Sequence, residues 1–152
     1  MKIYLASDHG GFHLKEALKA YLLTQGHDVE DEGAYTLDPL DDYPDFMYPA
    51  AQKIGADMDA RGIFLCRSGA GAAIVANKVR GVRAVVSRTV EDAQHARQHN
   101  DANVVALSSD SLTAEEARDI VATFLSTSFS GEERHLRRLK KIIKIEGASE
   151  QS

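Results

Sequence analysis

Residues 62–78 read GIFLCRSGAGAAIVANK and combine a short apolar run, a turn and the beginning of a second apolar stretch. The run GIFLC is nearly all apolar, which is typical of a central strand that is buried on both faces of a sheet. The stretch after the turn has the length and composition of a helix. A strand followed by a short turn and a helix is half of a βαβ unit, so this segment predicts a parallel sheet.

The same alternation extends along the whole chain. Four more runs rich in Val, Ile, Leu, Phe and Tyr are predicted to be strands, at 2–8, 27–33, 82–87 and 103–109. Stretches of helical length and periodicity lie at 12–22, 45–58, 71–79, 89–99, 113–126 and 131–145. The chain therefore predicts a three-layer α/β/α sandwich with a Rossmann-like, five-stranded parallel sheet and an additional C-terminal helix.

Length and composition fit one domain. A chain of 152 residues can bury roughly two-thirds of the surface that its unfolded form exposes. Apolar residues make up 43% and charged residues 27%, and no tract rich in Gly, Pro or Ser would serve as a linker. We expect a single domain over 1–152, of which 146–152 form a flexible tail.

Charge and cysteine usage argue against several classes of protein. The formal net charge of -5 is unfavourable for binding a nucleic-acid backbone. The single cysteine cannot form an intramolecular disulfide, and MKIYLASDHG lacks the apolar core of a secretory signal. No run approaches the roughly 20 apolar residues of a membrane helix. We expect a cytoplasmic protein that binds neither nucleic acid nor membrane.

Cys66 is the first candidate for chemistry. In open parallel sheets ligands bind beyond the carboxyl ends of the strands, where SDHGG, CRSGAG, SRTVED and the SSD after NVVAL should gather. A lone cysteine is commonly a small buried hydrophobe. Cys66, however, precedes a glycine-containing turn and a helix N-terminus, surroundings that can lower a thiol pKa from about 8.5 toward neutrality. We therefore favour a functional thiolate.

The turn SGAGAA has two interpretations. It matches neither G-x-x-x-x-G-K-[ST] nor G-x-G-x-x-G, so the sequence supports neither class of nucleotide site. Taken alone, it is best explained as an ordinary connection between a strand and a helix. The alternative is a nest in which the amides of residues 68–72 hold an enediolate oxygen.

Titratable residues at two other places also have two interpretations. Asp8 and His9 can form a turn and helix cap, or they can transfer protons to sugar hydroxyls. His99 and Asn100 lie at a predicted helix end, where a histidine can satisfy carbonyl groups or act as an acid or base near neutral pH. The sequence leaves both choices open.

The predicted C-terminal helix has one basic and one apolar face. Arg134 and Arg138 are four residues apart and share a face, which is either solvated or a fork for one phosphate dianion. We expect the apolar stripe to face the core; its members are Leu136, Leu139, Ile142, Ile143 and Ile145. The remaining histidines show no metal-ligand spacing, so no metal site is expected.

Taken in order, SDHGGF, DYPDF, CRSGAGAAIVANKVRGVRAVV, ARQHNDANVVAL and GEERHLRR resemble the motifs of the type B ribose-5-phosphate isomerases. Galactose-6-phosphate and allose-6-phosphate isomerases are relatives of that family. The resemblance covers residues 2 to about 145, and its most specific blocks are ANKVRGVRAVV and ARQHNDANV. It implies interconversion of D-ribose 5-phosphate and D-ribulose 5-phosphate in the pentose phosphate pathway, without metal or cofactor.

The resemblance also implies a partner and residue roles. The enzyme would be a homodimer, or a dimer of such dimers, with active sites shared between subunits. Cys66 would be the base and Ser68 would assist proton movement between oxygens, while His99 with Asp8 would open the sugar ring. His99 and Asn100 would come from the neighbouring subunit. The implied substrate-binding residues are His9, Tyr43, Asn100, Arg134 and Arg138, and the backbone amides of Arg67, Ser68, Gly69, Ala70 and Gly71.

Two positions depart from the family pattern. Arg67 replaces a glycine that usually follows the cysteine, and Asp110 stands where an arginine often contacts the phosphate. Loss of that arginine should weaken binding by roughly 1.5 to 3 kcal/mol unless Arg67 or Arg88 compensates.

Other functions remain open. The chain could act on allose 6-phosphate, galactose 6-phosphate or a four-carbon sugar phosphate, or it could bind a sugar phosphate without turnover. Retention of Cys66, Ser68, Asp8 and His99 favours catalysis. A redox function of Cys66 is poorly supported because the chain has no resolving cysteine.

Overall fold

The computed structural model describes residues 1–149 and contains a five-stranded parallel sheet. Its strand order is β2-β1-β3-β5-β4, so the apolar strand β3 lies at the centre, as the sequence predicts. The strands are β1 (Lys2–Ser7), β2 (Asp28–Asp31), β3 (Arg61–Cys66), β4 (Ala84–Val86) and β5 (Val104–Ser108).

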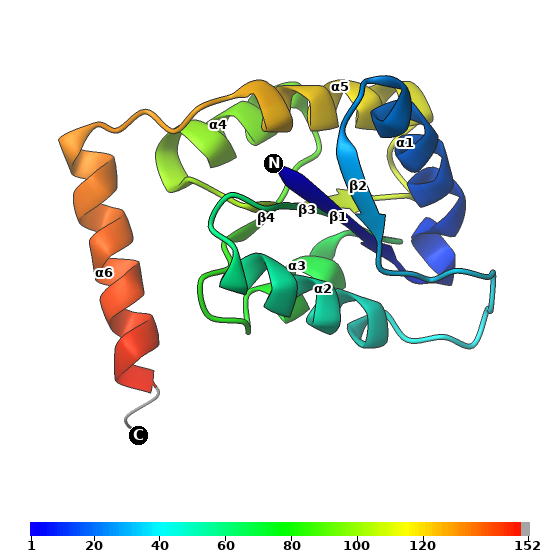
Figure 1. The fold of residues 1–152 in the computed structure, drawn as a ribbon, viewed down its shortest axis with the longest axis horizontal. Helices are drawn as coiled ribbons and strands as arrows, with labels where there is room; N and C mark the ends of the chain where they lie inside the picture. The colour runs from blue at the N-terminus through cyan, green and yellow to red at the C-terminus, as the bar shows by residue number, and fades with distance from the viewer. Residues whose placement is uncertain (150–152) are drawn as a thin grey trace.

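Helices cover both faces of the sheet, which confirms the predicted three-layer sandwich (Figure 1). They are α1 (Phe12–Thr24), α2 (Pro44–Ala56), α3 (Ala70–Ala76), α4 (Val90–Asn100), α5 (Ala114–Ser126) and α6 (Glu133–Ser149), with a short 3-10 helix η1 (His9–Gly11) before α1. The side chains of Thr89 and Thr113 accept hydrogen bonds from amides in the first turns of α4 and α5. These caps fix where the two helices begin.

Alternate residues of β3 enter two different cores. Ile63 and Leu65 pack beneath α1, α4 and α5, whereas Phe64 and Cys66 pack beneath α2 and α3. This alternation follows from the two-residue period of a strand. Burial of each large apolar side chain here contributes about 1.5–3 kcal/mol. The same alternation turns Cys66, the last residue of β3, toward α2 and α3.

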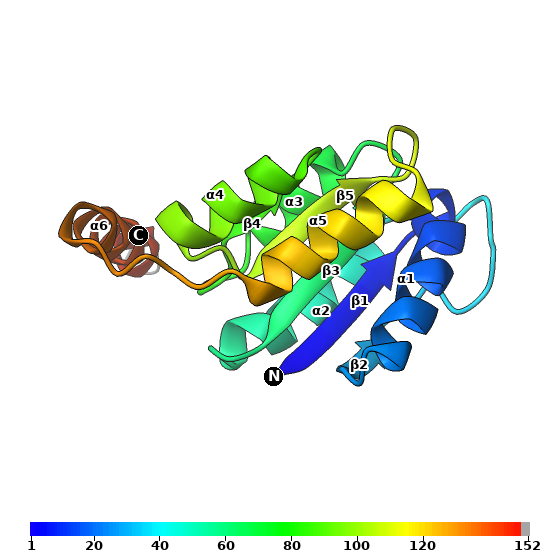
Figure 2. The ribbon, with the colours of Figure 1, turned by 90° about the horizontal axis from the view of Figure 1, so that it is seen from above.

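Helix α6 stands beside the sandwich rather than on it (Figures 1 and 2). The expectation of a core stripe on this helix is wrong for the single chain, because Leu139 is buried while Leu136, Ile142, Ile143 and Ile145 are 40–69% exposed. The segment after α5 carries the helix past the edge of the sheet, so its apolar face meets little of the body. Among residues 1–149, no helix has the length and apolar character needed to cross a bilayer.

The C-terminal end differs in part from the expected tail. Helix α6 continues to Ser149, so the first four residues of the predicted tail are helical. The remaining three, 150–152, lie outside the described residues.

Candidate active site

A cavity of about 330 Å³ lies at the carboxyl ends of β1 and β3, and it is lined by Asp8, His9, Tyr43, Cys66, Arg67, Ser68 and Gly71. All seven belong to the predicted site. A larger cavity, about 540 Å³, lies between α6, the end of α2 and the loop around Gly81. We place the chemistry in the smaller cavity because it gathers the thiol, the hydroxyl and the titratable groups.

Cys66 is 5% exposed, yet it lines the cavity. The amide of Gly69 donates a hydrogen bond to Sγ of Cys66 at 3.2 Å. This contact requires the chain to turn back on itself, and Gly69 does so with a left-handed φ of 77°. The turn therefore supplies a donor that can stay with the sulfur when the sulfur carries negative charge.

Ser68 is held by the next amide of the turn. The amide of Ala70 donates to Oγ of Ser68 at 3.2 Å. Gly71 has no side chain for a steric reason, since a Cβ there would lie 2.7 Å from the Tyr43 ring. The turn thus directs two amides to Cys66 and Ser68 themselves, a detail that the sequence did not predict.

Asp8 and His9 connect the cavity to η1. Asp8 is 6% exposed, and its Oδ1 accepts a hydrogen bond from the amide of Gly11 at 3.2 Å, so Asp8 does cap η1, one of the two roles that the sequence left open. Nδ1 of His9 lies 2.6 Å from Oδ1 of Asp41, and the His9 amide donates to the same oxygen at 2.9 Å. The hydrogen bond with Asp41, together with the negative charge of Asp8, raises the pKa of His9.

Sequence reasoning missed Asp41. It lies two residues before Tyr43, directly before the DYPDF motif, but nothing local shows that it meets His9. The side chain of Asp41 is only 9% exposed. A buried carboxylate in a polar loop therefore supports the site from behind.

Asp8, His9 and Asp41 also have donor atoms within 4.8 Å of one another, which is compatible with a metal ion. The 2.6 Å contact between His9 and Asp41 is a hydrogen bond, however, and it is shorter than the separation of about 3.3 Å between two ligands of one tetrahedral ion. Oδ1 of Asp8 is engaged by Gly11. Nδ1 of His9 and one oxygen of each carboxylate are therefore engaged by the protein itself, and we assign no metal to this cluster.

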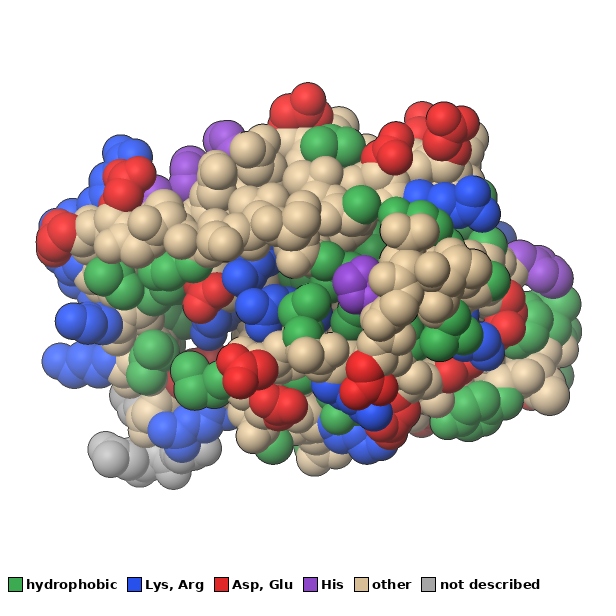
Figure 3. Space-filling model, turned by 45° about the horizontal axis from the view of Figure 1, so that its top comes forward, with side chains coloured by type: hydrophobic (Ala, Val, Ile, Leu, Met, Phe, Trp, Pro, Cys, Tyr) green, Lys and Arg blue, Asp and Glu red, His purple; other side chains and the backbone are tan. Residues whose placement is uncertain are grey.

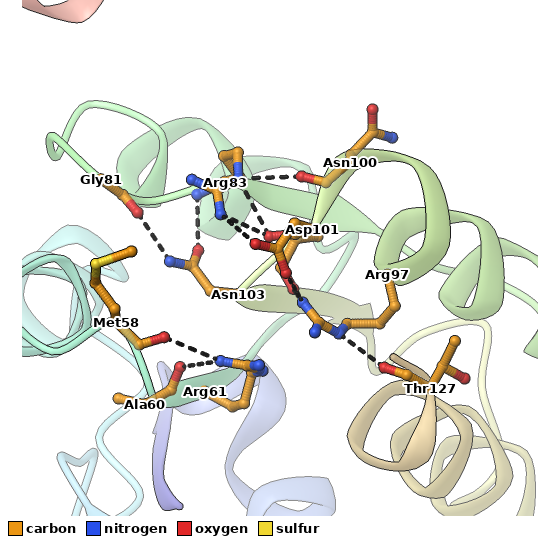
Figure 4. A network of polar contacts seen from close by, with 11 residues as sticks. Met58, Ala60, Arg61, Gly81, Arg83, Arg97, Asn100, Asp101, Asn103 and Thr127 are labelled. Carbon is orange, nitrogen blue, oxygen red and sulfur yellow. Dashed lines mark hydrogen bonds and ion pairs between the residues drawn. The ribbon is translucent and has the colours of Figure 1, made fainter. Parts of the chain in front are cut away.

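His99 and Asn100 lie at the other edge of the sheet. Helix α4 starts near the carboxyl ends of the strands and runs back, so its last residues reach the amino ends. There the carbonyl of Asn100 accepts a hydrogen bond from Nε of Arg83 at 3.0 Å. Arg61, at the start of β3, lies beside this network and donates to the carbonyls of Met58 and Ala60 (Figure 4). The length of β3, about 16 Å, separates this network from Cys66. Within one chain, His99 and Asn100 do not reach the cavity.

Helix α6 brings His135 against His99. The ring of His99 stacks on the ring of His135 with centroids 4.5 Å apart, and His95 lies 4.6 Å from His99 on its own helix. Burial, followed by the nearby positive charges, lowers the pKa of His135. Arg134 and Arg138 are exposed on α6, where Lys and Arg side chains gather (Figure 3). The predicted site residues thus form two groups at opposite edges of the sheet.

The comparisons with known proteins agree with this fold. Residues 3–142 match the family model described as Ribose/Galactose Isomerase. The chain belongs to this family. It is 43% identical, over 96% of its length and 92% of the relative, to ribose-5-phosphate isomerase B of Mycolicibacterium paratuberculosis. The predicted resemblance is confirmed.

Solved structures of this isomerase family match over nearly the whole chain. Ribose-5-phosphate isomerase B from Mycoplasma genitalium, crystallised with bound ribulose-5-phosphate, has a TM-score of 0.93, 42% identity and 96% coverage of each chain. The enzyme from Clostridium thermocellum has a TM-score of 0.93 and 41% identity, covering 98% of this chain and 99% of that one.

The two departures from the isomerase pattern meet in space. Nη1 of Arg67 lies 3.6 Å from Oδ1 of Asp110, and both side chains are more than half exposed. Arg67 lines the cavity, whereas Arg88 does not. Of the two arginines considered as replacements, Arg67 is the one that lines the cavity.

Proposed function

We propose that this chain is an aldose-ketose isomerase that interconverts D-ribose 5-phosphate and D-ribulose 5-phosphate through a cis-enediolate. The observation that carries the proposal is the hydrogen bond from the Gly69 amide to the Cys66 sulfur in a cavity that also holds Asp8 and Ser68. The volume of about 330 Å³ is at the small end of ligand sites, as suits a five-carbon sugar phosphate. The ligand bound in the Mycoplasma genitalium structure supports the same substrate.

The thiolate of Cys66 removes the proton from C2 of the open-chain aldose, and the electron pair moves into the C1–C2 bond to form the enediolate. Backbone amides between Arg67 and Gly71 other than those of Gly69 and Ala70, which donate to Cys66 and Ser68, stabilise the negative oxygen; one such donor is worth about 10²–10³ in rate. Ser68 passes a proton between the oxygens on C1 and C2. The proton held by Cys66 returns to C1, which completes the ketose.

Ring opening and phosphate binding use the second group of residues, supplied by a second copy of the chain. His99 with Asp8 opens the sugar ring, Asn100 with His9 and Tyr43 holds hydroxyls, and Arg134 with Arg138 binds the phosphate. The separation of about 16 Å along β3 supports this division, since His99 cannot act on a sugar beside Cys66 of its own chain. A two-fold dimer would bring each group to the other's cavity.

The exposed apolar face of α6 supports the homodimer. Leu136, Ile142 and Ile143 are 40–53% exposed in the single chain, and a second copy would cover them. The thiolate must also stay reduced, which suits the cytoplasm and a place in the pentose phosphate pathway.

The alternative is isomerisation of another sugar phosphate. The pairing of Arg67 with Asp110 favours this possibility, because it changes the charges at the rim of the cavity. Assays of the purified chain with ribose 5-phosphate, allose 6-phosphate, galactose 6-phosphate and a four-carbon aldose phosphate decide between them. We expect the highest kcat/KM with ribose 5-phosphate. A higher value with a six-carbon or four-carbon sugar would establish the alternative, and binding without turnover would overturn both.

A further inference from the structure

Asp41 lies behind His9 without lining the cavity itself. It belongs to the loop between β2 and α2 and is 32 positions away from His9 in sequence. Its side chain is 9% exposed, whereas that of His9 is 23% exposed and reaches the cavity. Any effect of Asp41 on a ligand must therefore pass through His9.

One oxygen of Asp41 fixes both the backbone and the ring of His9. Oδ1 accepts from the His9 amide at 2.9 Å and contacts Nδ1 at 2.6 Å. An imidazole has two nitrogens, so Nδ1 is committed to Asp41 and Nε2 is the nitrogen left for a ligand. The partner of one ring nitrogen sets the protonation of the other.

The charges around His9 favour its protonated form. The hydrogen bond between Asp41 and the ring is the largest influence and raises the pKa of His9, and the negative charge of Asp8 acts in the same direction. Burial and the guanidinium of Arg67, in the turn after β3, oppose this shift without reversing it. Oδ2 of Asp41 is buried and has no hydrogen-bond partner among residues 1–149. A buried carboxylate with one unpartnered oxygen is destabilising unless a nearby cation compensates it.

We propose that Asp41 is a positioning residue that holds His9 as a cationic Nε2–H donor toward an oxygen of the sugar phosphate. This inference rests on the proposed function for the identity of the ligand. The contact between Asp41 and His9 does not depend on that function, since it forms without a substrate.

A purely structural role for Asp41 is the alternative, in which the carboxylate only ties the loop before α2 to η1. Asp41→Asn separates the two roles, because the amide oxygen can accept the same two hydrogen bonds while the negative charge is lost. Asp42→Asn is the matched control: Asp42 is the next residue of the loop, carries the same charge and is exposed.

The test begins with NMR titration of the His9 ring in the full-length protein without substrate. Nitrogen chemical shifts of the wild type should show a protonated Nδ1 over the whole titration. In Asp41→Asn the His9 midpoint should move to lower pH, and in Asp42→Asn it should stay. An unprotonated Nδ1 in the wild type, or equal midpoints in all three proteins, would overturn the inference, and the first of these results needs no variant to fold.

Kinetics then test the link to the ligand. Each unit by which the His9 pKa falls reduces its protonated fraction about tenfold at pH values above both midpoints. At pH values above both midpoints, KM of Asp41→Asn should therefore exceed that of the wild type by about tenfold for each unit by which the midpoint falls, and it should recover as the pH is lowered, with kcat less affected. In a His9→Gln background the same change should have no further effect. An unchanged KM would refute the positioning role. If the wild type turns over no sugar phosphate, the proposed function fails, whereas the titration still decides whether Asp41 controls His9.

Discussion

The guanidinium of Arg67 and the carboxylate of Asp110 form an ion pair of 3.6 Å at the rim of the cavity. The side chains are 65% and 62% exposed, so the pair adds little to stability, about 0–1 kcal/mol. The Cγ atom of Arg67 also packs closely over Gly10, where a Cβ would lie at 2.6 Å. This packing holds the arginine beside His9 and the mouth of the cavity, a position suited to binding an anion.

Arg67→Gly should raise KM for the sugar phosphate by about tenfold or more, because a charge-assisted hydrogen bond contributes about 1.5–3 kcal/mol. The melting temperature should stay within a degree or two, as expected for an exposed pair. Asp110→Asn is the opposite test: it frees Arg67 and should lower KM. Steady-state kinetics of both variants check the prediction, and unchanged KM values would show that Arg67 does not contact the substrate.

Arg134 and Arg138 should bind the phosphate in the assembled enzyme. Replacing either with Ala should raise KM by roughly tenfold while kcat changes less, since each removes a charged contact remote from the reacting carbons. Arg137→Ala is the matched control, because Arg137 lies on the same helix and pairs with Glu133 at 2.8 Å, just as Arg134 pairs with Glu132 at 3.0 Å. Equal effects of all three replacements would indicate a general loss of positive charge on α6 instead.

Mixed dimers test the shared site. Cys66→Ala and His99→Ala chains should each be inactive alone. After random mixing, half of the dimers carry one chain of each kind, and each mixed dimer regains one of two sites, so about a quarter of the wild-type activity should return. Mixing two batches of the same variant is the control. No recovery in dimers shown to be mixed would place His99 and Cys66 in separate functions.

Lys15 and Asp31 form a buried pair that supports α1 beside β2. Lys15 is fully buried, and its Nζ lies 2.7 Å from Oδ2 of Asp31. Burial alone would raise the pKa of Asp31, but hydrogen bonds from Lys15, Lys19 and the Gly33 amide together hold it below the usual value. The stability from this group is therefore fully present above the ordinary Asp pKa and is lost as pH falls through the lowered one.

Asp31→Asn should destabilise the protein by about 3–5 kcal/mol at neutral pH, because it leaves the Lys15 ammonium buried without its main partner. Lys15→Met, which removes the buried cation and keeps the volume, should be much milder. Urea unfolding of both variants measures the difference. Equal destabilisation would mean that packing rather than charge determines the effect.

Much of the fold was predictable because it follows from local patterns. The apolar run GIFLC lies at the centre of the sheet, and strand ends gather Asp8, His9, Cys66 and Ser68 at one edge. The edge strands β2 and β4 are shorter than their predicted ranges, and α6 is longer. These elements lie at the periphery of the fold, so the pattern of apolar residues constrains their ends weakly.

The rest could not be predicted, since it depends on contacts between distant segments. Nothing near Asp41 or His9 indicates that the two side chains meet, and nothing in the sequences of α4 and α6 indicates that His99 stacks on His135. The apolar face of α6 was expected to pack on the core, but it is largely exposed in the single chain. A stripe of Leu and Ile predicts that a helix face will be covered but cannot say by which chain.

Isomerisation of ribose 5-phosphate in D₂O measures the role of Cys66 most directly. The wild type should place solvent deuterium on the carbon beside the carbonyl. Cys66→Ala should lose both exchange and turnover by at least about 10²–10⁴-fold, the usual contribution of a general base, while it binds the sugar phosphate within a few-fold of the wild type. Exchange at the wild-type rate in Cys66→Ala would contradict the assignment of this thiol as the base.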